Sequence, residues 1–549
     1  MPSDAAGRRR RRPSRRGDPT LLGLDLLVAL GAAIVAADYA AGRLRLATPI
    51  LLLAAGVLLG FIPVLRTVTL PPEAVLVLFL PALLYWEALT TSLRQVRRDL
   101  RVIVLLSTFL VIATAAVVAA VAHALGLPWG PAWVLGSALA PTDATAIAAL
   151  GRLLPYRSLT VLRTESLIND GTALVVYGLA VGVTVGQEHL GLAHVTWLFA
   201  RSYLAGIAAG ALAALLGAWL RRHITEPLPH NTVVVLIPFA SFLFADEIGG
   251  SGVLAVVTAG LIMTQIGPRV GTAAARLQTQ GFWTLSTFLL NAALFVLVGL
   301  QAQAAVRGLS SIDLARACAA IAAVCAVLIA VRITFQFVSV YVIRALDRRP
   351  AQRLRRASHR MRIISGIAAF RGAVSLAAAL AVPQSLGNGQ PFPDRDVIVF
   401  VTFGVIVLGL VTQGIALPLV LRWVHLPTST TLDEERHFAE TTAVQEALDA
   451  LPDTAAGLDT DTKITERLTG EYRKHLRILD ARAPEAAAED PALRYDQQYR
   501  ALRLALLSRK RATVLRLRDA QRIDDEVLRQ IQAQLDLEEV RLSGTIISE

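Results

Sequence analysis

The sequence predicts an all-α polytopic membrane protein with a helical tail, and three observations lead to this fold class. Of its 549 residues, 54% are hydrophobic and only 17% are charged, which is more apolar than an ordinary soluble domain. From about residue 20 to 424, successive apolar stretches are long enough to cross the ~30 Å hydrocarbon core as helices. After residue 425 the chain is rich in Asp, Glu, Arg, Ala and Leu, and no stretch there could span a bilayer.

The apolar stretches divide the chain into three parts. We expect an Arg-rich N-terminal tail at 1–19, a membrane domain at 20–424 and a cytoplasmic helical domain at 425–549. Short loops containing Arg, Gly and Pro separate the stretches, and these residues end helices. Thirteen crossings are expected, near 20–40, 47–64, 73–92, 102–125, 131–150, 164–185, 199–220, 231–247, 251–266, 282–304, 314–343, 363–382 and 396–424.

Arginines in the connecting loops predict the orientation, because cytoplasmic loops carry an excess of basic residues. With the C-terminal part inside, the inward loops hold 21 arginines and the outward loops about five. Thirteen crossings then put the N-terminus outside, although residues 8–16 (RRRRRPSRR) would favour the cytoplasm. The inward loops lie near 41–46, 91–101, 151–163, 221–230, 267–280 and 344–362.

The third and fifth segments each carry a carboxylate. Glu87 lies near the end of the third segment, where an interfacial or structural role is more expected than ion binding. In the fifth segment, Pro141 removes a backbone donor and should break the helix, and Thr142 and Asp143 follow directly. Broken backbone at membrane depth is tolerated where it is buried in protein or lines a watery cavity. The alternative is an ordinary proline kink with a solvated Asp143.

The sixth segment begins with TESLINDGTALVVY, which places Glu165, Asn169 and Asp170 in an otherwise apolar stretch. Helical spacing puts Glu165 and Asn169 on one face and Asp170 one residue further round. Ionisable residues within membrane segments are costly, so they point by default to a functional site. The alternative, a loop or a buried soluble helix, conflicts with the rest of the chain.

The eleventh and twelfth segments supply the compensating charges. Arg332 lies well inside the eleventh and needs a carboxylate partner if buried. Arg371, followed by a glycine, interrupts the twelfth, unless it snorkels to the interface. The fifth and twelfth segments cross in opposite directions. Two interrupted helices at matching positions of an inverted repeat, meeting at mid-membrane, indicate the binding site of a secondary transporter.

A charge inventory then predicts an ion site. Two arginines could offset two of the three carboxylates Asp143, Glu165 and Asp170, which leaves one acid that must bind a proton or a cation. Competition between H⁺ and a hard cation such as Na⁺ for the same oxygens is antiport chemistry. Asp170 is the candidate, with further oxygens from Thr142, Asp143, Ser166 and Asn169. No phosphate-binding loop occurs, so ATP-driven pumping has no support, and neither a cofactor nor an enzymatic reaction is expected.

In these features the chain resembles the bacterial branch of the sodium/proton exchanger family of monovalent cation:proton antiporters. The resemblance covers residues 20–424 and lies in six motifs that occur in the family's order. These are FLPALLYWEAL at 79–89, APTDATA at 140–146, TESLINDGTALVVY at 164–177, SGVLAVVTAGL at 251–261, LLNAALFVLVGLQ at 289–301 and FRGAVSLAAAL at 370–380.

The resemblance implies a homodimer with a dimerisation domain and a mobile core domain that moves like an elevator. It implies that Asp170, in the Asn-Asp pair, binds the ion or the proton, with Thr142, Asp143 and Ser166 nearby. It further implies that Glu165 pairs with Arg332 and that Arg371 belongs to the interrupted twelfth helix. Asn169, in place of a second Asp, resembles the electroneutral branch, which exchanges one cation for one proton.

Several functions remain open from the sequence. The leading hypothesis is electroneutral exchange of Na⁺ or Li⁺ for H⁺ across a bacterial plasma (inner) membrane, with no nucleic acid involved. K⁺/H⁺ antiport is the main rival, because selectivity depends on cavity size that motifs do not report. A drug exporter would predict twelve helices in parallel repeats. A membrane cation sensor that signals through the tail is a further alternative, although the tail contains no recognisable catalytic or DNA-binding motif.

Overall fold

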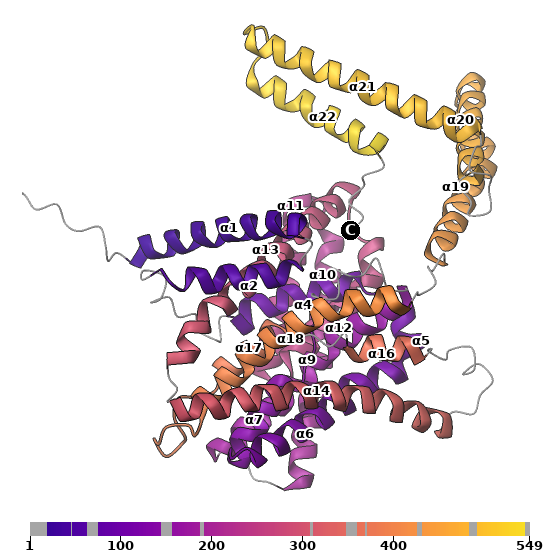
Figure 1. Ribbon diagram of the computed structural model, residues 1–549. Coiled ribbons are helices and arrows are strands. Elements are labelled where there is room, and N and C mark those ends of the chain that lie inside the picture. Colours follow the sequence, from indigo (N-terminus) through magenta and orange to yellow (C-terminus); the bar gives the residue numbers. More distant parts are fainter. Residues whose placement is uncertain are drawn as a thin grey trace, which may run out of the picture. The chain divides into compact units, whose positions relative to one another are not determined.

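In the computed structural model, helices are the only regular secondary structure among the described residues, where the only β contact is an isolated bridge between Ser385 and Pro391 (Figure 1). The chain divides into two compact units, Met1–Pro427 and Thr428–Glu549. The Arg-rich tail at 1–18 lies outside the described residues. These are 19–44, 47–62, 75–143, 156–186, 191–307, 311–346, 359–367, 371–424, 431–481 and 491–543.

Nine helical segments within the described residues are long and apolar enough to cross a membrane. Two shorter apolar helices, Thr48–Leu59 and Val77–Thr90, accompany them. The expected total of thirteen crossings stays a prediction, because the fifth and twelfth segments are broken and part of each lies outside the described residues. The nine are Leu26–Leu44, Leu93–Ala124, Leu159–Val185, Ala193–His223, Pro227–Glu247, Gly252–Arg269, Ala273–Gln301, Ala315–Ser339 and Arg395–Ala416.

Seven helices of the first unit pack mainly on one another and form bundle A. Its tightest contact lies between the second and the last of them, where Gly56 and Gly299 let the two backbones meet. A Cβ added at Gly56 would lie 2.0 Å from the Val296 carbonyl oxygen, so no larger residue fits. The bundle consists of α1 (Pro19–Leu44), α2 (Thr48–Leu59), α4 (Leu80–Thr90), α10 (Leu192–His223), α11 (Pro227–Glu247), α12 (Gly252–Ile266) and α13 (Ala273–Arg307).

The short turns η2 (Val75–Phe79) and η5 (Gly267–Arg269) also contact bundle A, and the other helices of this unit form bundle B. Here too a glycine sets a close approach, because a Cβ on Gly136 would lie 2.3 Å from the Ala115 carbonyl oxygen. Bundle B consists of α5 (Leu93–Val104), the π-helical turn η3 (Leu105–Phe109), α6 (Leu110–Ala124), α7 (Trp129–Leu139), α9 (Tyr156–Val185), α14 (Ser311–Leu346), α16 (His359–Ile367), α17 (Ala373–Leu380) and α18 (Arg395–Val424).

One expected loop is a helix. The arginine-rich stretch 91–101 was expected to be an inward loop, but α5 occupies most of it and runs on through η3 into α6. Ser92 caps its start, because the Ser92 hydroxyl accepts a hydrogen bond from the Gln95 amide. Val96 and Ile103 are buried at helical spacing, so one face of α5 packs inward while arginines occupy the others.

Both interrupted segments lose helical structure at their polar residues. In the fifth, α7 ends at Leu139 and residues 140–143 are not helical. In the twelfth, α16 ends at Ile367, Arg371 and Gly372 are not helical, and α17 starts at Ala373. Residues 144–155 and 368–370 lie outside the described residues. These two stretches therefore supply free backbone groups and charged side chains inside bundle B.

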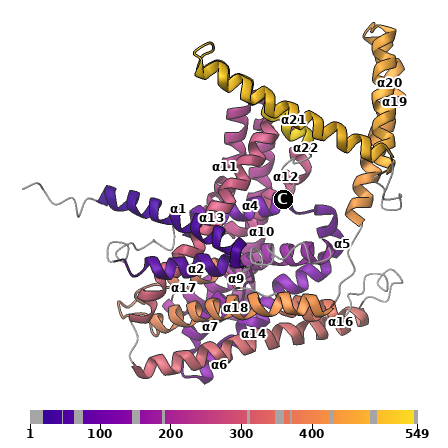
Figure 2. The same cartoon turned by 45° about the horizontal axis from the view of Figure 1, so that its top comes forward.

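The second unit contains two helical pairs, which Figures 1 and 2 draw as two hairpins. One pair is α19 (Thr431–Gly457) with α20 (Thr462–Ala481), and the other is α21 (Pro491–Asp519) with α22 (Asp525–Ser543). Leu479 on α20, Leu507 on α21, and Leu528 and Leu535 on α22 are buried in this unit.

Candidate functional site

The two broken segments of bundle B each place a charge against the other's helix end. Arg371 is 5% exposed, and its Nε donates a hydrogen bond of 3.1 Å to the carbonyl of Leu139, the last residue of α7. In the opposite direction, the Asp143 carboxylate packs on Gly372, which directly precedes α17. A cation at a helix C-terminus and an anion at an N-terminus both interact favourably with the helix dipole. The two breaks therefore stabilise each other.

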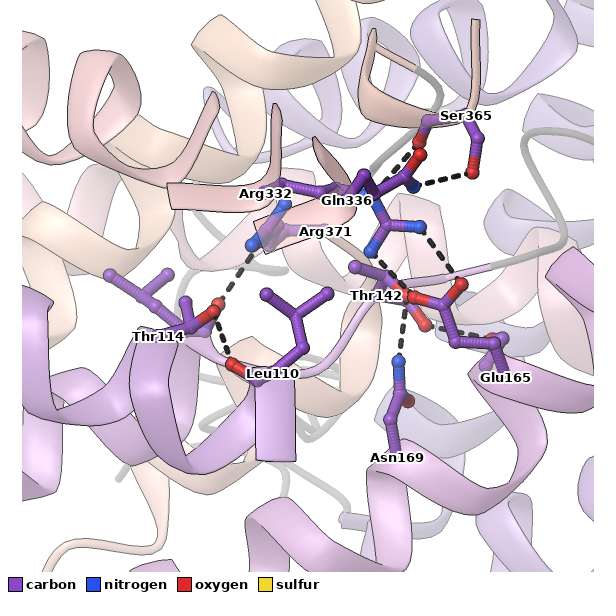
Figure 3. Close-up of polar contacts among 11 residues, drawn as sticks. Leu110, Thr114, Thr142, Glu165, Asn169, Arg332, Gln336, Ser365 and Arg371 are labelled. Carbon is purple, nitrogen blue, oxygen red and sulfur yellow. Dashed lines mark hydrogen bonds and ion pairs between the residues drawn. The ribbon is translucent and has the colours of Figure 1, made fainter. Parts of the chain in front are cut away.

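Glu165 on α9 and Arg332 on α14 form a buried ion pair (Figure 3). Arg332 Nη1 lies 2.6 Å from Glu165 Oε1, and Arg332 Nη2 donates to Oε2 at 3.0 Å. The Nε of the same guanidinium donates to the Ser365 carbonyl on α16 at 2.9 Å. This bidentate geometry is the strongest form of an arginine–carboxylate ion pair. One acid and one arginine thereby neutralise each other and tie α9, α14 and α16 together.

Thr142, in the break after α7, is held by two residues of α9. The Ser166 hydroxyl donates to the Thr142 carbonyl at 2.7 Å. The Asn169 side-chain amide donates to the Thr142 hydroxyl oxygen, also at 2.7 Å (Figure 3). All three residues are buried. Because Ser166 and Asn169 both donate hydrogen bonds to Thr142, they fix the position of the unwound backbone next to Asp170.

A cavity of about 50 Å³ lies between bundles A and B. By volume it has room for about three water-sized groups. From bundle B, the residues Thr142, Asp143, Ser166 and Asp170 reach it, together with Ser375 on α17. From bundle A it is lined by α4 and α13, including Glu87 and Asn291, and by the apolar side chains Leu80, Leu83, Leu84, Leu294 and Phe295.

Two carboxylates in this cavity have no hydrogen-bond or ion-pair partner within the described part of the chain. They are Asp170, which is 6% exposed, and Glu87. An unpaired carboxylate in such surroundings is stable only if a proton or a cation neutralises it. The cavity is also lined by residues with neutral side-chain oxygens, which are ligands that hard cations prefer. These are the hydroxyls of Thr142, Ser166 and Ser375 and the amide of Asn291.

The sequence assigned Glu87 to a structural or interfacial role, whereas the structure places it in the same cavity as Asp170. A signal for this position was present. Leu80, Leu84 and Glu87 follow at helical spacing, so the acid shares the face of α4 that carries the buried leucines. What the spacing could not report is which helix this face meets.

Asn169 is the one predicted ion-binding residue that does not line this cavity. It lines a smaller cavity of about 10 Å³ behind the break, together with Glu165, Arg332 and Arg371. Its position suits the task of holding Thr142 rather than direct contact with an ion. The predicted residues thus separate into two groups on either side of the unwound segment.

The amino-acid sequence matches a family model described as the transmembrane sodium/hydrogen exchanger, over residues 27–423. An uncharacterized Na⁺/H⁺ exchanger of Mycobacterium tuberculosis is 44% identical over 527 residues, which is 96% of this chain and 97% of the relative. A sodium, potassium, lithium and rubidium/H⁺ antiporter of Bacillus pumilus is 27% identical over 78% of this chain and 66% of its own length.

A solved structure has a similar fold. The sodium/proton antiporter MjNhaP1 of Methanocaldococcus jannaschii has a TM-score of 0.55 with 19% sequence identity, over 73% of this chain and 100% of the other. The nine apolar helical segments and the family match together identify a multi-pass membrane protein. On the strength of the match over residues 27–423 and of the mycobacterial relative, this chain belongs to the sodium/hydrogen exchanger family of cation/proton antiporters.

Proposed function

We propose that the protein exchanges Na⁺ or Li⁺ for H⁺ across the bacterial plasma membrane, with both ions competing for Asp170. The observation that carries the proposal is the buried Asp170 carboxylate, which has no partner in the described chain and faces a cavity between two helix bundles. Glu165 cannot fill this role, because Arg332 occupies both of its oxygens. Thr142, Asp143 and Ser166 supply further oxygens around the ion.

Charge balance explains how such a cavity could exchange one cation for one proton. If Glu87 keeps a proton throughout, Asp170 with Na⁺ and Asp170 with H⁺ leave the same total charge in the cavity. Each turnover then moves no net charge. If Glu87 instead released its proton when Na⁺ binds, two protons would be exchanged per Na⁺. Electroneutral transport therefore requires that Glu87 does not change its protonation state during the cycle.

The division into two bundles supports alternating access. The cavity walls come from both bundles, so a displacement of one against the other would open the site to one side and then to the other. Bundle B carries Asp170 and both broken helices, so the ion would move with this bundle. Bundle A would then be the part through which two copies associate as a homodimer.

The identity of the cation has two candidates. Na⁺ is supported by the name of the mycobacterial relative, and K⁺/H⁺ antiport by the relative from Bacillus pumilus, whose name includes both ions. The excess of arginines in the inward loops supports a cytoplasmic C-terminal unit.

The proposal is tested with the purified protein in proteoliposomes that carry a pH gradient. We expect Na⁺ and Li⁺ to collapse the gradient while the membrane voltage is clamped at zero. Asp170→Asn should abolish the response, because the amide can neither release a proton nor balance a cation. Asp246→Asn, which changes an exposed acid at the end of α11, is the matched control and should behave as the wild type. Exchange by the Asp170→Asn variant would refute the assignment, and a response to K⁺ alone would select the rival cation.

A further inference from the structure

Helix α21 of the second unit carries an exposed apolar stripe. Tyr495, Tyr499, Leu502 and Leu506 follow at intervals of four, three and four residues, so they lie along one face of the helix. Between 46% and 63% of each of these side chains is exposed, although aromatic and leucine side chains usually contribute to cores. Lys474 of α20 lies 4.2 Å from the Tyr495 ring centre and covers only part of it. Lys474 and Arg503 also lie beside the Tyr499 ring, at 5.4 and 5.8 Å from its centre, so the stripe is an apolar surface that this unit covers only in part.

The stripe leads into a groove between α21 and α22. The groove has a volume of about 490 Å³ and is lined by Leu506 and Val514 on α21 and by Ile531 and Leu535 on α22. Basic side chains also line it, namely Arg509 and Lys510. Stripe and groove together form one amphipathic surface along α21, with an apolar floor and a basic edge.

The charges on this face are positive. Arg503, Arg509, Lys510 and Arg516 flank the stripe on the helical wheel, and only Glu538 of α22 opposes them, through ion pairs with Arg503 and Lys510. The two acids of α21 do not reduce this charge. Asp496 pairs with Arg500, and Asp519 lies at the end of the helix on another face. Arg509 has no side-chain partner within the described residues.

Two other helices of the unit, α19 and α22, have the opposite net charge. Helix α19 carries seven acids and one arginine, whereas α21 carries eight basic residues and two acids. This polarity favours one orientation of the unit towards an anionic surface. The chain tethers this unit to the membrane domain, because only six residues separate the end of α18 from the start of α19, and these span at most about 21 Å when fully extended. A second copy of α21 is a poorer partner, since it would bring two basic edges together.

We propose that this amphipathic surface of α21 binds the anionic phospholipid headgroups of the adjacent bilayer leaflet. The apolar stripe enters the headgroup region, the two tyrosines lie at the interface, and the flanking arginines and Lys510 contact lipid phosphates. Binding couples the position of the second unit to the lipid composition around the transporter. The inference is independent of which cation the membrane part transports.

The test uses the full-length protein reconstituted in nanodiscs, with Cys318 and Cys325 replaced by Ala. A Leu502→Cys variant carries a fluorophore, and the lipids carry a bromine quencher in their acyl chains. We expect strong quenching when the nanodiscs contain phosphatidylglycerol, and several-fold weaker quenching in pure phosphatidylcholine. The matched position is a Ser508→Cys variant, on the opposite side of α21, which should be quenched little in either lipid.

A charge reversal provides the second measurement. Adding Arg509→Glu to the labelled variant should weaken binding of α21 to the anionic lipid about fivefold or more. One basic residue near an anionic surface strengthens lipid binding by about this factor, and the new acid is also repelled. Arg473→Glu makes the same change at an exposed site of α20 and should have a much smaller effect. Equal quenching at positions 502 and 508, or no dependence on phosphatidylglycerol, would overturn the proposal. Efficient disulfide cross-linking between two unlabelled Leu502→Cys copies would overturn it as well, in favour of contact between protomers.

Discussion

The buried pair of Glu165 and Arg332 permits a quantitative stability prediction. Glu165→Ala removes the one carboxylate, with both of its oxygens, that pairs with the Arg332 guanidinium, which is 3% exposed. The Ser365 carbonyl then remains as a hydrogen-bond acceptor for Arg332. Unit charges at about 4 Å attract by about 4 kcal/mol at an effective dielectric constant of ~20. Removing one partner of a buried pair costs about 3–5 kcal/mol. We therefore expect Glu165→Ala to lower the free energy of unfolding by about this amount.

The assay is thermal unfolding of the purified protein in detergent, followed by tryptophan fluorescence. Glu165→Ala and Arg332→Ala should each lower the midpoint clearly. The double variant Glu165→Ala with Arg332→Ala leaves neither charge of the pair unpaired, so its midpoint should fall by less than the sum of the two single decreases. Glu247→Ala removes an exposed acid and serves as the control. If the thermal midpoint of Glu165→Ala equalled that of the Glu247→Ala control, the ion pair would not hold α9 and α14 together.

Three further predictions concern single residues. Gly372→Ala places a methyl group 1.7 Å from a carboxylate oxygen, so we expect a large loss of gradient collapse in proteoliposomes, whereas Gly267→Ala meets no atom within 4 Å and should be silent. Glu87→Gln should retain Na⁺-driven exchange, because the amide imitates a carboxyl that keeps its proton; an inactive variant would mean that Glu87 ionises during transport. His230 accepts a hydrogen bond of 3.2 Å from the buried Arg221 and must be neutral there. His230→Lys should therefore lower the thermal midpoint more than His230→Gln, and equal midpoints would contradict this reading.

Much of this site follows from residue chemistry alone. An arginine inside an apolar segment needs a carboxylate, and Arg332 has Glu165 as its partner in the structure. A proline followed by a threonine and an acid predicts broken backbone, and α7 ends two residues before Pro141. These inferences use only the high free-energy cost of unpaired charges and missing backbone donors in an apolar medium, so they do not require knowledge of which helices touch.

The remaining features depend on lateral packing, which periodicity does not report. The sequence places Glu87 near the end of its own helix, whereas the structure shows that it lines the same cavity as Asp170 of the neighbouring α9. Asn169 and Asp170 are adjacent in sequence, but their side chains point to different cavities. Likewise the arginine-rich stretch 91–101 was expected to be a loop from composition alone, because composition does not distinguish a loop from an amphipathic helix.

The contacts across the two broken helices have a mechanical consequence. Arg371 reaches from one break to the end of α7, and Asp143 reaches from the other break to the beginning of α17. Withdrawing either half-helix by itself would remove the counter-charges from two helix termini at once, inside a buried part of bundle B. The two half-helices, α7 and α17, are therefore expected to move as one rigid unit. The displacement of bundle B that is proposed above would therefore have to move both half-helices together, with the contacts of Arg371 and Asp143 kept intact.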